Sequence, residues 1–316
     1  MSVFRLIFYL FLFIVTSSSS LSLTSLTSTG AAISTTGYLI VPGASLYYET
    51  YGAGPLLLFV SGANGDADIW RPVAKILASN YRVAIYDRRG FSRSYLSATG
   101  LQNYTQRLQT DAADANHLAK HLQFNGTATV LGTSSGAIVA LEILQTYSST
   151  FKTVIVHEPP ALTILPDAAN LTAQQKSIYT TYRAVGIPAA MYVFAQTYDP
   201  ASNTTRIGTG SVDGFTIDSR QGNFISGNLQ YWFERELLQY PLQGLNLTNI
   251  RVYSKNLVLA VGKDTTPESP QYRANTLMAS TFGLAVDMLA GGHVGYIGDT
   301  RVEFAADLAG VLAKRE

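Results

Sequence analysis

The chain has 316 residues, of which 47% are hydrophobic and 14% are charged, so it can bury one sizeable hydrophobic core. Its 22 basic and 21 acidic side chains leave a formal charge of +1, which argues against binding to nucleic acids or anionic membranes. Cysteine is absent, which excludes disulfides, thiolate metal sites and a cysteine nucleophile. We therefore expect a small-molecule partner, and the composition leaves the oligomeric state unknown.

Residues 1–20 have the layout of a secretory signal peptide. Arg5 precedes an unbroken apolar run at 6–15, and small residues follow at 16–20. The run is shorter than the roughly 20 residues that a membrane-spanning helix needs, although an uncleaved signal anchor is the alternative. Residues 21–36 are rich in Ser and Thr and predict a flexible linker. We expect a protein that is secreted or lies in the lumen of the secretory pathway, without membrane contact after signal cleavage.

Five Asn-x-Ser/Thr sequons fit passage through the secretory pathway, and none has proline at the middle position. They lie at Asn103, Asn125, Asn170, Asn203 and Asn246. One such match would mean little, but five in a chain with a signal peptide predict a glycoprotein.

Strand and helix patterns alternate from residue 37 onward. Residues 37–41 and 45–51 are β-rich runs separated by Pro42 and Gly43, which predicts an antiparallel hairpin at a sheet edge. Residues 55–60 are continuously apolar, as expected of a strand buried on both faces. Further strands are expected near 82–86, 129–131, 153–156, 256–261 and 284–289, and helices near 68–78, 104–122, 269–282 and 301–312.

Residues 161–250 interrupt this alternation and carry many aromatic residues among polar ones, which predicts a mostly helical insertion. Strands separated by helices imply parallel pairing with right-handed crossovers. We therefore predict an α/β fold, a three-layer sandwich with a mostly parallel sheet of about eight strands, formed by residues 37–316 with 161–250 as a cap.

The central motif is Gly132-Thr133-Ser134-Ser135-Gly136, which lies between a β-type run and an apolar helical run. Strand, Gly-x-Ser-x-Gly turn and helix in this order predict a nucleophile elbow, in which the backbone of the serine is strained and its hydroxyl is exposed at the end of the sheet. The alternative is an ordinary strand-to-helix turn. We expect Ser134 to be a nucleophile.

A serine hydroxyl is a poor nucleophile at neutral pH, so it needs an adjacent base and a carboxylate that orients the base. His293 is the best candidate base, because it lies in a glycine-rich loop between the last strand and the last helix. His157 ends an earlier strand. His117 and His121 lie one helical turn apart, where solvent-facing side chains are more expected than a metal pair, since no third ligand is obvious.

The best candidate acid is Asp264, which follows the strand at 257–261 and stands between the serine and the histidine in the chain, the order that this architecture uses. A solvated turn aspartate is the alternative interpretation. Glu158 is the second candidate, and Asp287, inside a strand, is less plausible.

An oxyanion hole needs backbone N–H groups aimed at the developing negative charge, each worth about 3 kcal/mol. Ser135, the first residue of the elbow helix, supplies one. Ala63 is expected to supply the other, with Gly62 and Asn64 as near alternatives. The sequence gives no sign of a metal or an organic cofactor.

Taken together, these motifs resemble those of the α/β-hydrolase superfamily, in particular its esterase and haloperoxidase-like branch with a helical cap. The resemblance covers residues 37–313 and rests on residues 59–65, 86–94, 132–136, 262–264 and 291–293. It implies an α/β-hydrolase sandwich with Ser134 as nucleophile, Asp264 as acid and His293 as base.

Two positions depart from the pattern of the family. Ser61 stands where many relatives have histidine, and Ser92 stands where the loop after Asp87 often has glycine. With Ser61, the side-chain support of the oxyanion loop is expected to differ from that in those relatives. With Ser92, the tight turn after Asp87 is in doubt.

The expected function is hydrolysis of a small, apolar ester or lactone through an acyl-enzyme. Serine rather than aspartate at position 134 argues against epoxide hydrolase and haloalkane dehalogenase chemistry. Two alternatives stay open: cyclisation, condensation or elimination on the same fold, and a non-catalytic binding protein.

Overall fold

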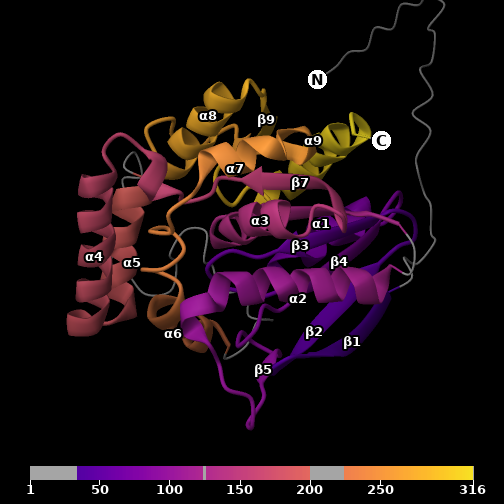
Figure 1. Cartoon of the computed structure of the whole chain (residues 1–316), viewed down its shortest axis with the longest axis horizontal. Coiled ribbons are helices and arrows are strands. Elements are labelled where there is room, and N and C mark those ends of the chain that lie inside the picture. The colour runs from indigo at the N-terminus through magenta and orange to yellow at the C-terminus, as the bar shows by residue number, and fades with distance from the viewer. Residues whose placement is uncertain (1–33, 124–125, 200–223, 316) are drawn as a thin grey trace, which may run out of the picture. The chain divides into compact units, whose positions relative to one another are not determined.

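The computed structural model describes residues 34–123, 126–199 and 224–315. Within these residues one nine-stranded sheet runs in the order β1-β2-β4-β3-β6-β7-β8-β9, and the short β5 pairs with β2 (Figure 1). The strands are β1 Ser34–Val41, β2 Ala44–Tyr51, β3 Leu56–Val60, β4 Arg82–Tyr86, β5 Tyr95–Leu96, β6 Ala128–Thr133, β7 Phe151–His157, β8 Leu257–Gly262 and β9 Val286–Leu289. All neighbours from β4 to β9 along this order are parallel, which confirms the mostly parallel sheet.

Helices cover both faces of the sheet, so the predicted three-layer sandwich is confirmed (Figure 1). Helices α2, α3 and α8 bury side chains against one face, and α1 and α9 against the other. The helices are α1 Arg71–Leu77, α2 Arg107–Leu122, α3 Ser135–Thr146, α4 Ala168–Val185, α5 Ile187–Tyr198, α6 Phe224–Arg235, α7 Leu247–Val252, α8 Pro270–Phe282 and α9 Arg301–Ala313. Short 3-10 turns lie at Asp68–Trp70, Tyr104–Gln106, Leu162–Ile164, Ser254–Asn256 and Gly298–Thr300.

The apolar run of β3 is buried on both faces, as predicted. Successive side chains of a strand point to opposite faces: Leu56, Leu58 and Val60 belong to the core on the α2–α3 side, and Leu57 and Phe59 to the core on the α1–α9 side. All five are buried. The continuous hydrophobicity of this segment is therefore a requirement of two separate cores.

The predicted edge hairpin is present as β1 and β2, with Tyr38 opposite Tyr47. Gly43 takes φ 78° in its turn, a conformation that glycine adopts without steric cost. One expected boundary is wrong: residues 34–36, expected in the linker, belong to β1, where they pair with the end of β2.

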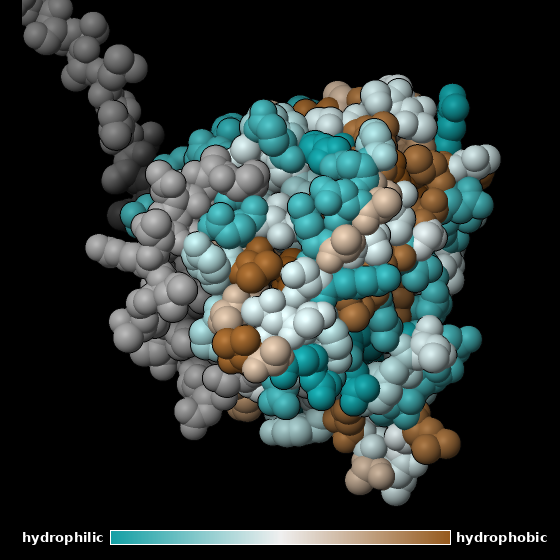
Figure 2. All heavy atoms as spheres, turned by 90° about the vertical axis from the view of Figure 1, so that its left-hand side faces the viewer, coloured by the Kyte–Doolittle hydropathy of each residue, from teal (hydrophilic) through white to brown (hydrophobic). Residues whose placement is uncertain are grey.

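The described part of the 161–250 insertion is mostly helical and contains α4, α5 and α6. Helix α4 buries Leu171, Gln175 and Ile178, which share one face of a helix by their spacing. Hydrophilic side chains dominate the opposite, outer surface, and hydrophobic ones occur there in separate small groups (Figure 2). The assigned signal peptide and part of the insertion lie outside the described residues. Among the helices that are described, none is long and apolar enough to span a bilayer.

Candidate active site

The candidate residues lie on loops at one edge of the sheet, since the parallel strands β3, β4, β6, β7, β8 and β9 all end there. Ligands of open α/β sheets bind outside these carboxyl ends. Residues that are distant in sequence are thus brought together by topology alone.

Ser134 occupies the turn between β6 and α3, with φ 54° and ψ −124°. Its N–H donates to the carbonyl of His157, at 3.0 Å. From Ala128 to Leu141 it is the one residue that is not buried. The turn therefore presents the serine side chain to the edge of the sheet, as the elbow motif predicts.

The two glycines of the motif are required by close packing. A Cβ at Gly132 would lie 2.1 Å from the carbonyl oxygen of Gly136, and a Cβ at Gly136 would lie 2.3 Å from that of Val60. Any side chain at either position would push α3 away from β6 or β3. The glycines therefore fix the place of Ser134 relative to the sheet.

Backbone strain is concentrated around this edge. Among the described residues other than glycine, only Ser92, Ser134 and Glu158 have positive φ, at 42°, 54° and 49°. Such conformations cost free energy and persist where the surrounding structure holds them, often at functional sites. Each of the three follows a strand of the sheet in the chain.

His293 lies in the loop between β9 and the turn before α9. Its Nδ1 is 2.6 Å from Oε2 of Glu158, which is fully buried at the end of β7. The other carboxylate oxygen, Oε1, accepts the N–H of Gly262 at 2.7 Å. With Nδ1–H donating to Glu158, the tautomer of His293 leaves Nε2 as a free acceptor.

Glu158 stays ionised in this place. Burial raises its pKa, but the hydrogen bond from His293, the charge of the neighbouring imidazoles and the N–H of Gly262 outweigh burial, and the pKa of Glu158 falls to about 2. A buried carboxylate that is ionised beside an imidazole stabilises the imidazolium form.

The expectation that Asp264 orients His293 is corrected by this geometry. Asp264 is exposed, and its side chain makes no hydrogen bond or ion pair with the residues that the structure describes. Asp264 lies in a turn closed by a hydrogen bond from the N–H of Thr265 to the carbonyl of Gly262, and this turn places Asp264 at the surface. Glu158 instead follows β7 directly, and its positive φ changes the direction of the backbone there. Both carboxylates lie between Ser134 and His293 in sequence, so chain order alone could not separate them.

His157 is fully buried next to Glu158, and its ring stacks 6.2 Å from that of His293. Its Nδ1 is 2.9 Å from Oγ1 of Thr133. Burial lowers the pKa of His157 to about 4, so the ring is neutral at physiological pH. We assign it a packing role beneath the site rather than that of a base.

The two expected oxyanion donors flank Ser134. The N–H of Ser135, at the start of α3, has no acceptor within the helix, as for the first residues of any helix. The loop after β3 lies directly against the serine, because a Cβ at Gly62 would be 2.9 Å from Cβ of Ser134. Ala63 follows in this loop and is buried.

Ser134 and His293 line the same cavity. The remaining walls are mainly apolar and come largely from the cap: Pro160, Phe194, Tyr198, Trp232 and Pro241, with Ser135 and Gln175. Sequence reasoning placed aromatic residues over the site but could not say which of them reach it.

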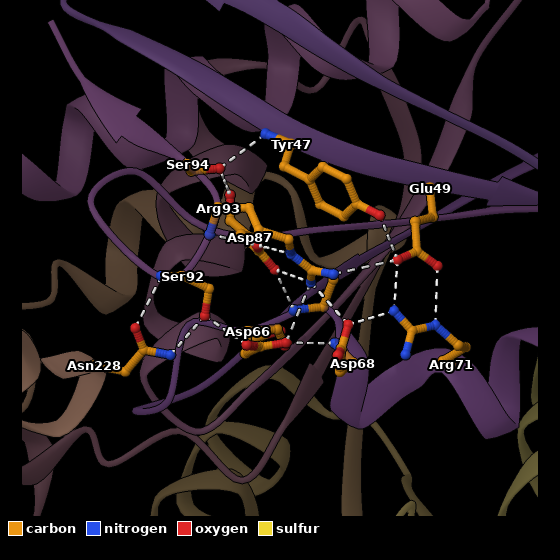
Figure 3. Close-up of polar contacts among 12 residues, drawn as sticks. Tyr47, Glu49, Asp66, Asp68, Arg71, Asp87, Ser92, Arg93, Ser94 and Asn228 are labelled. Carbon is orange, nitrogen blue, oxygen red and sulfur yellow. Dashed lines mark hydrogen bonds and ion pairs between the residues drawn. The ribbon is translucent and has the colours of Figure 1, made fainter. Parts of the chain in front are cut away.

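The loop after β4 is held by a polar cluster that includes Asp66, Asp68 and Asp87 (Figure 3). Arg93 is central: its Nε donates to Asp87 at 2.6 Å and its Nη2 to Asp68 at 2.7 Å. Ser92, where the family that the sequence resembles often has glycine, takes left-handed φ, and its N–H donates to Asn228 of α6 at 2.9 Å. The tight turn that Ser92 put in doubt is thus formed, with the cap helix as its partner.

The remaining histidines have other surroundings. Nε2 of His121 is 3.1 Å from the hydroxyl of Tyr48, and His117 is exposed on α2. Across residues 34–123, 126–199 and 224–315, no three His, Cys, Asp or Glu side chains are grouped as a metal site would require.

Comparison with known proteins supports the fold. A model of the alpha/beta hydrolase family matches residues 57–307. The chain is 31% identical over 265 residues to the uncharacterized hydrolase YraK of Bacillus subtilis strain 168, an alignment that covers 82% of this chain and 90% of YraK.

Solved structures share the fold. A thermophilic esterase from Thermogutta terrifontis matches with a TM-score of 0.66 at 17% identity, covering 88% of this chain and 99% of the esterase. The enol-lactonase of Burkholderia xenovorans LB400 matches with a TM-score of 0.62 at 14% identity, covering 88% of this chain and all of the lactonase (100%).

Proposed function

This chain belongs to the α/β-hydrolase family and is a hydrolase, and from that premise we propose that it is a secreted serine hydrolase of small, apolar esters or lactones. One arrangement carries the proposal. Ser134, strained and unburied in the elbow, shares a cavity with His293, whose Nδ1 is 2.6 Å from a buried, ionised Glu158. This arrangement supports Ser134 as nucleophile, His293 as base and Glu158 as the acid that orients the base.

In the proposed reaction, Nε2 of His293 accepts the hydroxyl proton of Ser134 as Oγ attacks the carbonyl carbon of the substrate. The N–H groups of Ser135 and Ala63 stabilise the tetrahedral oxyanion. When this intermediate collapses, the alcohol leaves with the proton from His293 and an acyl-enzyme forms. Water then attacks the acyl carbon, His293 accepts its proton and returns it to Oγ, and the carboxylic acid is released.

The cavity supports a small, apolar substrate. Its described lining contains aromatic and proline side chains and no Lys, Arg, Asp or Glu. The one amide among them, Gln175, donates to the carbonyl of Leu237 at 2.7 Å and accepts from Tyr198 at 2.9 Å. With its polar atoms already bonded, Gln175 contributes little new polarity to a ligand, so shape and burial select the substrate.

A fluorophosphonate probe tests the proposal. We expect the purified protein to be labelled at Ser134, mapped by mass spectrometry, and the label to disappear in His293→Ala. Hydrolysis of a short-chain aryl ester in ¹⁸O-labelled water should place one heavy oxygen in the acid product. Absence of labelling in folded protein would refute the activated serine, and a product without added water would refute hydrolysis.

The proposed secretion rests on the sequence of residues 1–20 and on the sequons. Asn103, Asn170 and Asn246 are exposed, so the acceptors that the structure describes are accessible to glycosylation. Asn125 and Asn203 lie outside the described residues. N-terminal sequencing of protein from a eukaryotic host, with mass analysis before and after glycosidase treatment, tests cleavage and glycosylation together. An intact N-terminus and an unchanged mass would refute both.

A further inference from the structure

Arg88 makes an unexpected contact with the oxyanion loop. It lies directly after Asp87 in the loop that follows β4, and its side chain is fully buried. Its Nη2 donates to the carbonyl oxygen of Gly62 at 2.8 Å, and the same oxygen accepts the N–H of Gly65 at 3.0 Å. A charged donor and a backbone donor therefore hold one carbonyl group.

That carbonyl determines where a proposed oxyanion donor points. The C=O of Gly62 and the N–H of Ala63 belong to the same peptide group, which is planar. In a trans peptide the two bonds point in opposite directions, and the described residues contain no cis peptide. Whatever holds the Gly62 oxygen consequently also directs the Ala63 N–H. A hydrogen bond to a charged donor is shorter and stronger than one between neutral groups.

Arg88 is in turn held by the cap. Glu236, the residue that follows α6, accepts from both terminal nitrogens of Arg88, at 3.0 and 2.7 Å. Asp111 of α2 accepts from Nη1 at 2.8 Å, and Arg107 donates to Glu236 at 3.1 Å. All these side chains are buried, so water does not compete for their positions.

The same cap helix contacts the second oxyanion residue. Trp232 of α6 donates its indole N–H to Oγ of Ser135 at 3.2 Å, and both residues are buried. Trp232 and Glu236 are four residues apart and lie on neighbouring positions of one helical surface. One short segment of the cap thus contacts the supports of both oxyanion donors.

We propose that segment 232–236 of the cap is the positioning element of the oxyanion hole: Glu236 orients the Gly62–Ala63 peptide through Arg88, and Trp232 supports Ser135. This inference rests on the proposed function, because it concerns the same reaction. Arg88 and Glu236 are positioning residues that do not touch the substrate. The cap therefore contributes to the rate of the chemical step as well as to the walls of the cavity.

Arg89 offers a matched control. It is the next residue in the chain, it is also buried, and its Nε and Nη2 donate to Asp114 at 2.8 and 2.7 Å. Its side chain makes no hydrogen bond with the oxyanion loop. Arg89→Lys and Arg88→Lys therefore disturb similar buried ion pairs, and only Arg88→Lys loses the contact with Gly62.

The test compares Arg88→Lys, Glu236→Gln and Arg89→Lys with the wild type on an aryl ester and on its thionoester, in which sulfur replaces the carbonyl oxygen. Loss of a whole oxyanion donor lowers kcat about 100- to 1,000-fold, so a misdirected one should cost about 10- to 100-fold. We expect this loss for Arg88→Lys and Glu236→Gln on the ester, with KM within about 3-fold. Sulfur is a weak acceptor, so the thionoester rate should change less.

The ratio of ester to thionoester rates distinguishes positioning from general damage, since misfolding lowers both rates equally. We expect the ratio to fall in Arg88→Lys and Glu236→Gln and to stay at the wild-type value in Arg89→Lys. If Arg88→Lys does not fold, Glu236→Gln carries the test. Wild-type kcat and ratio in the folded variants would overturn the inference. A wild type without labelling at Ser134 and without esterase activity would instead refute the proposed function itself, and this inference with it.

Discussion

Replacing Glu158 by glutamine should nearly abolish activity, because one amide cannot replace both carboxylate interactions. Oε1 accepts the N–H of Gly262 and Oε2 faces Nδ1 of His293. Glutamine has a single acceptor oxygen and an NH2 group. Either Gly262 loses its acceptor or His293 meets a donor, which would reverse the tautomer that leaves Nε2 free.

The magnitude follows from the ionisation of Glu158. Its pKa falls from 4.5 to about 2, and each tenfold change in acidity corresponds to about 1.4 kcal/mol, so its charge is favoured by about 3 kcal/mol. Losing that interaction where imidazolium develops should lower kcat about 100-fold. The wrong tautomer adds to this, as a comparable carboxylate-to-amide change in a Ser-His-Asp triad costs about 10,000-fold. We expect a loss within that interval.

The assay is steady-state hydrolysis of a short-chain aryl ester at pH 7 to 8, with fluorophosphonate labelling of Ser134 as a second measurement. Asp264→Asn is the matched control, because it makes the same type of change in the other candidate acid. We expect Asp264→Asn to alter kcat less than about 3-fold, in keeping with an exposed side chain. A larger loss in Asp264→Asn than in Glu158→Gln, with both variants folded, would refute our assignment of the acid.

Three further predictions concern stability. Burial lowers the pKa of His157 to about 4, so the neutral ring contributes stability that is fully present above pH 6.5 and is lost as the pH falls through about 4. In urea titrations, the free energy of unfolding of His157→Asn should therefore fall by up to about 3 kcal/mol less than that of the wild type over this pH range. Burial and the charges of Asp87 and Asp68 raise the pKa of Asp66 to about 6, which has the opposite sign: as the pH rises from 4 to 6, the melting temperature of the wild type should fall relative to that of Asp66→Asn, and a constant difference between the two would contradict this. Gly136→Ala should lose at least about 2 kcal/mol in denaturant unfolding, because its Cβ would meet the carbonyl of Val60 at 2.3 Å; an unchanged midpoint would disprove the packing argument.

Sequence was sufficient where the determinants are local. The apolar run of β3, the elbow around Ser134 and the loop of His293 each carry their signal within a few residues. A strand buried on both faces must be apolar throughout. Glycine is needed at positions 132 and 136 because the backbones of neighbouring elements approach closely there. These features were predicted at the correct positions.

Sequence was insufficient where partners are distant. Arg88 and Glu236 are 148 residues apart, and no periodicity or motif relates them. The choice between Glu158 and Asp264 depended on the φ of one residue and on a turn after β8, neither of which composition specifies. The left-handed conformation of Ser92 could not be predicted from sequence for the same reason, because the partner of its N–H is Asn228 of the distant cap.

The buried pairing of Arg88 with Glu236 also restricts how substrates enter. Withdrawing Glu236 would leave buried Arg88 with Asp111 as its remaining carboxylate partner, and loss of a partner of a buried charge is strongly unfavourable, so we expect α6 to lift as a lid only rarely. We therefore expect substrate access through rotation of side chains at the mouth of the cavity rather than through swinging of the helix. Amide hydrogens in the last turn of α6 should accordingly exchange as slowly as those of the central strands.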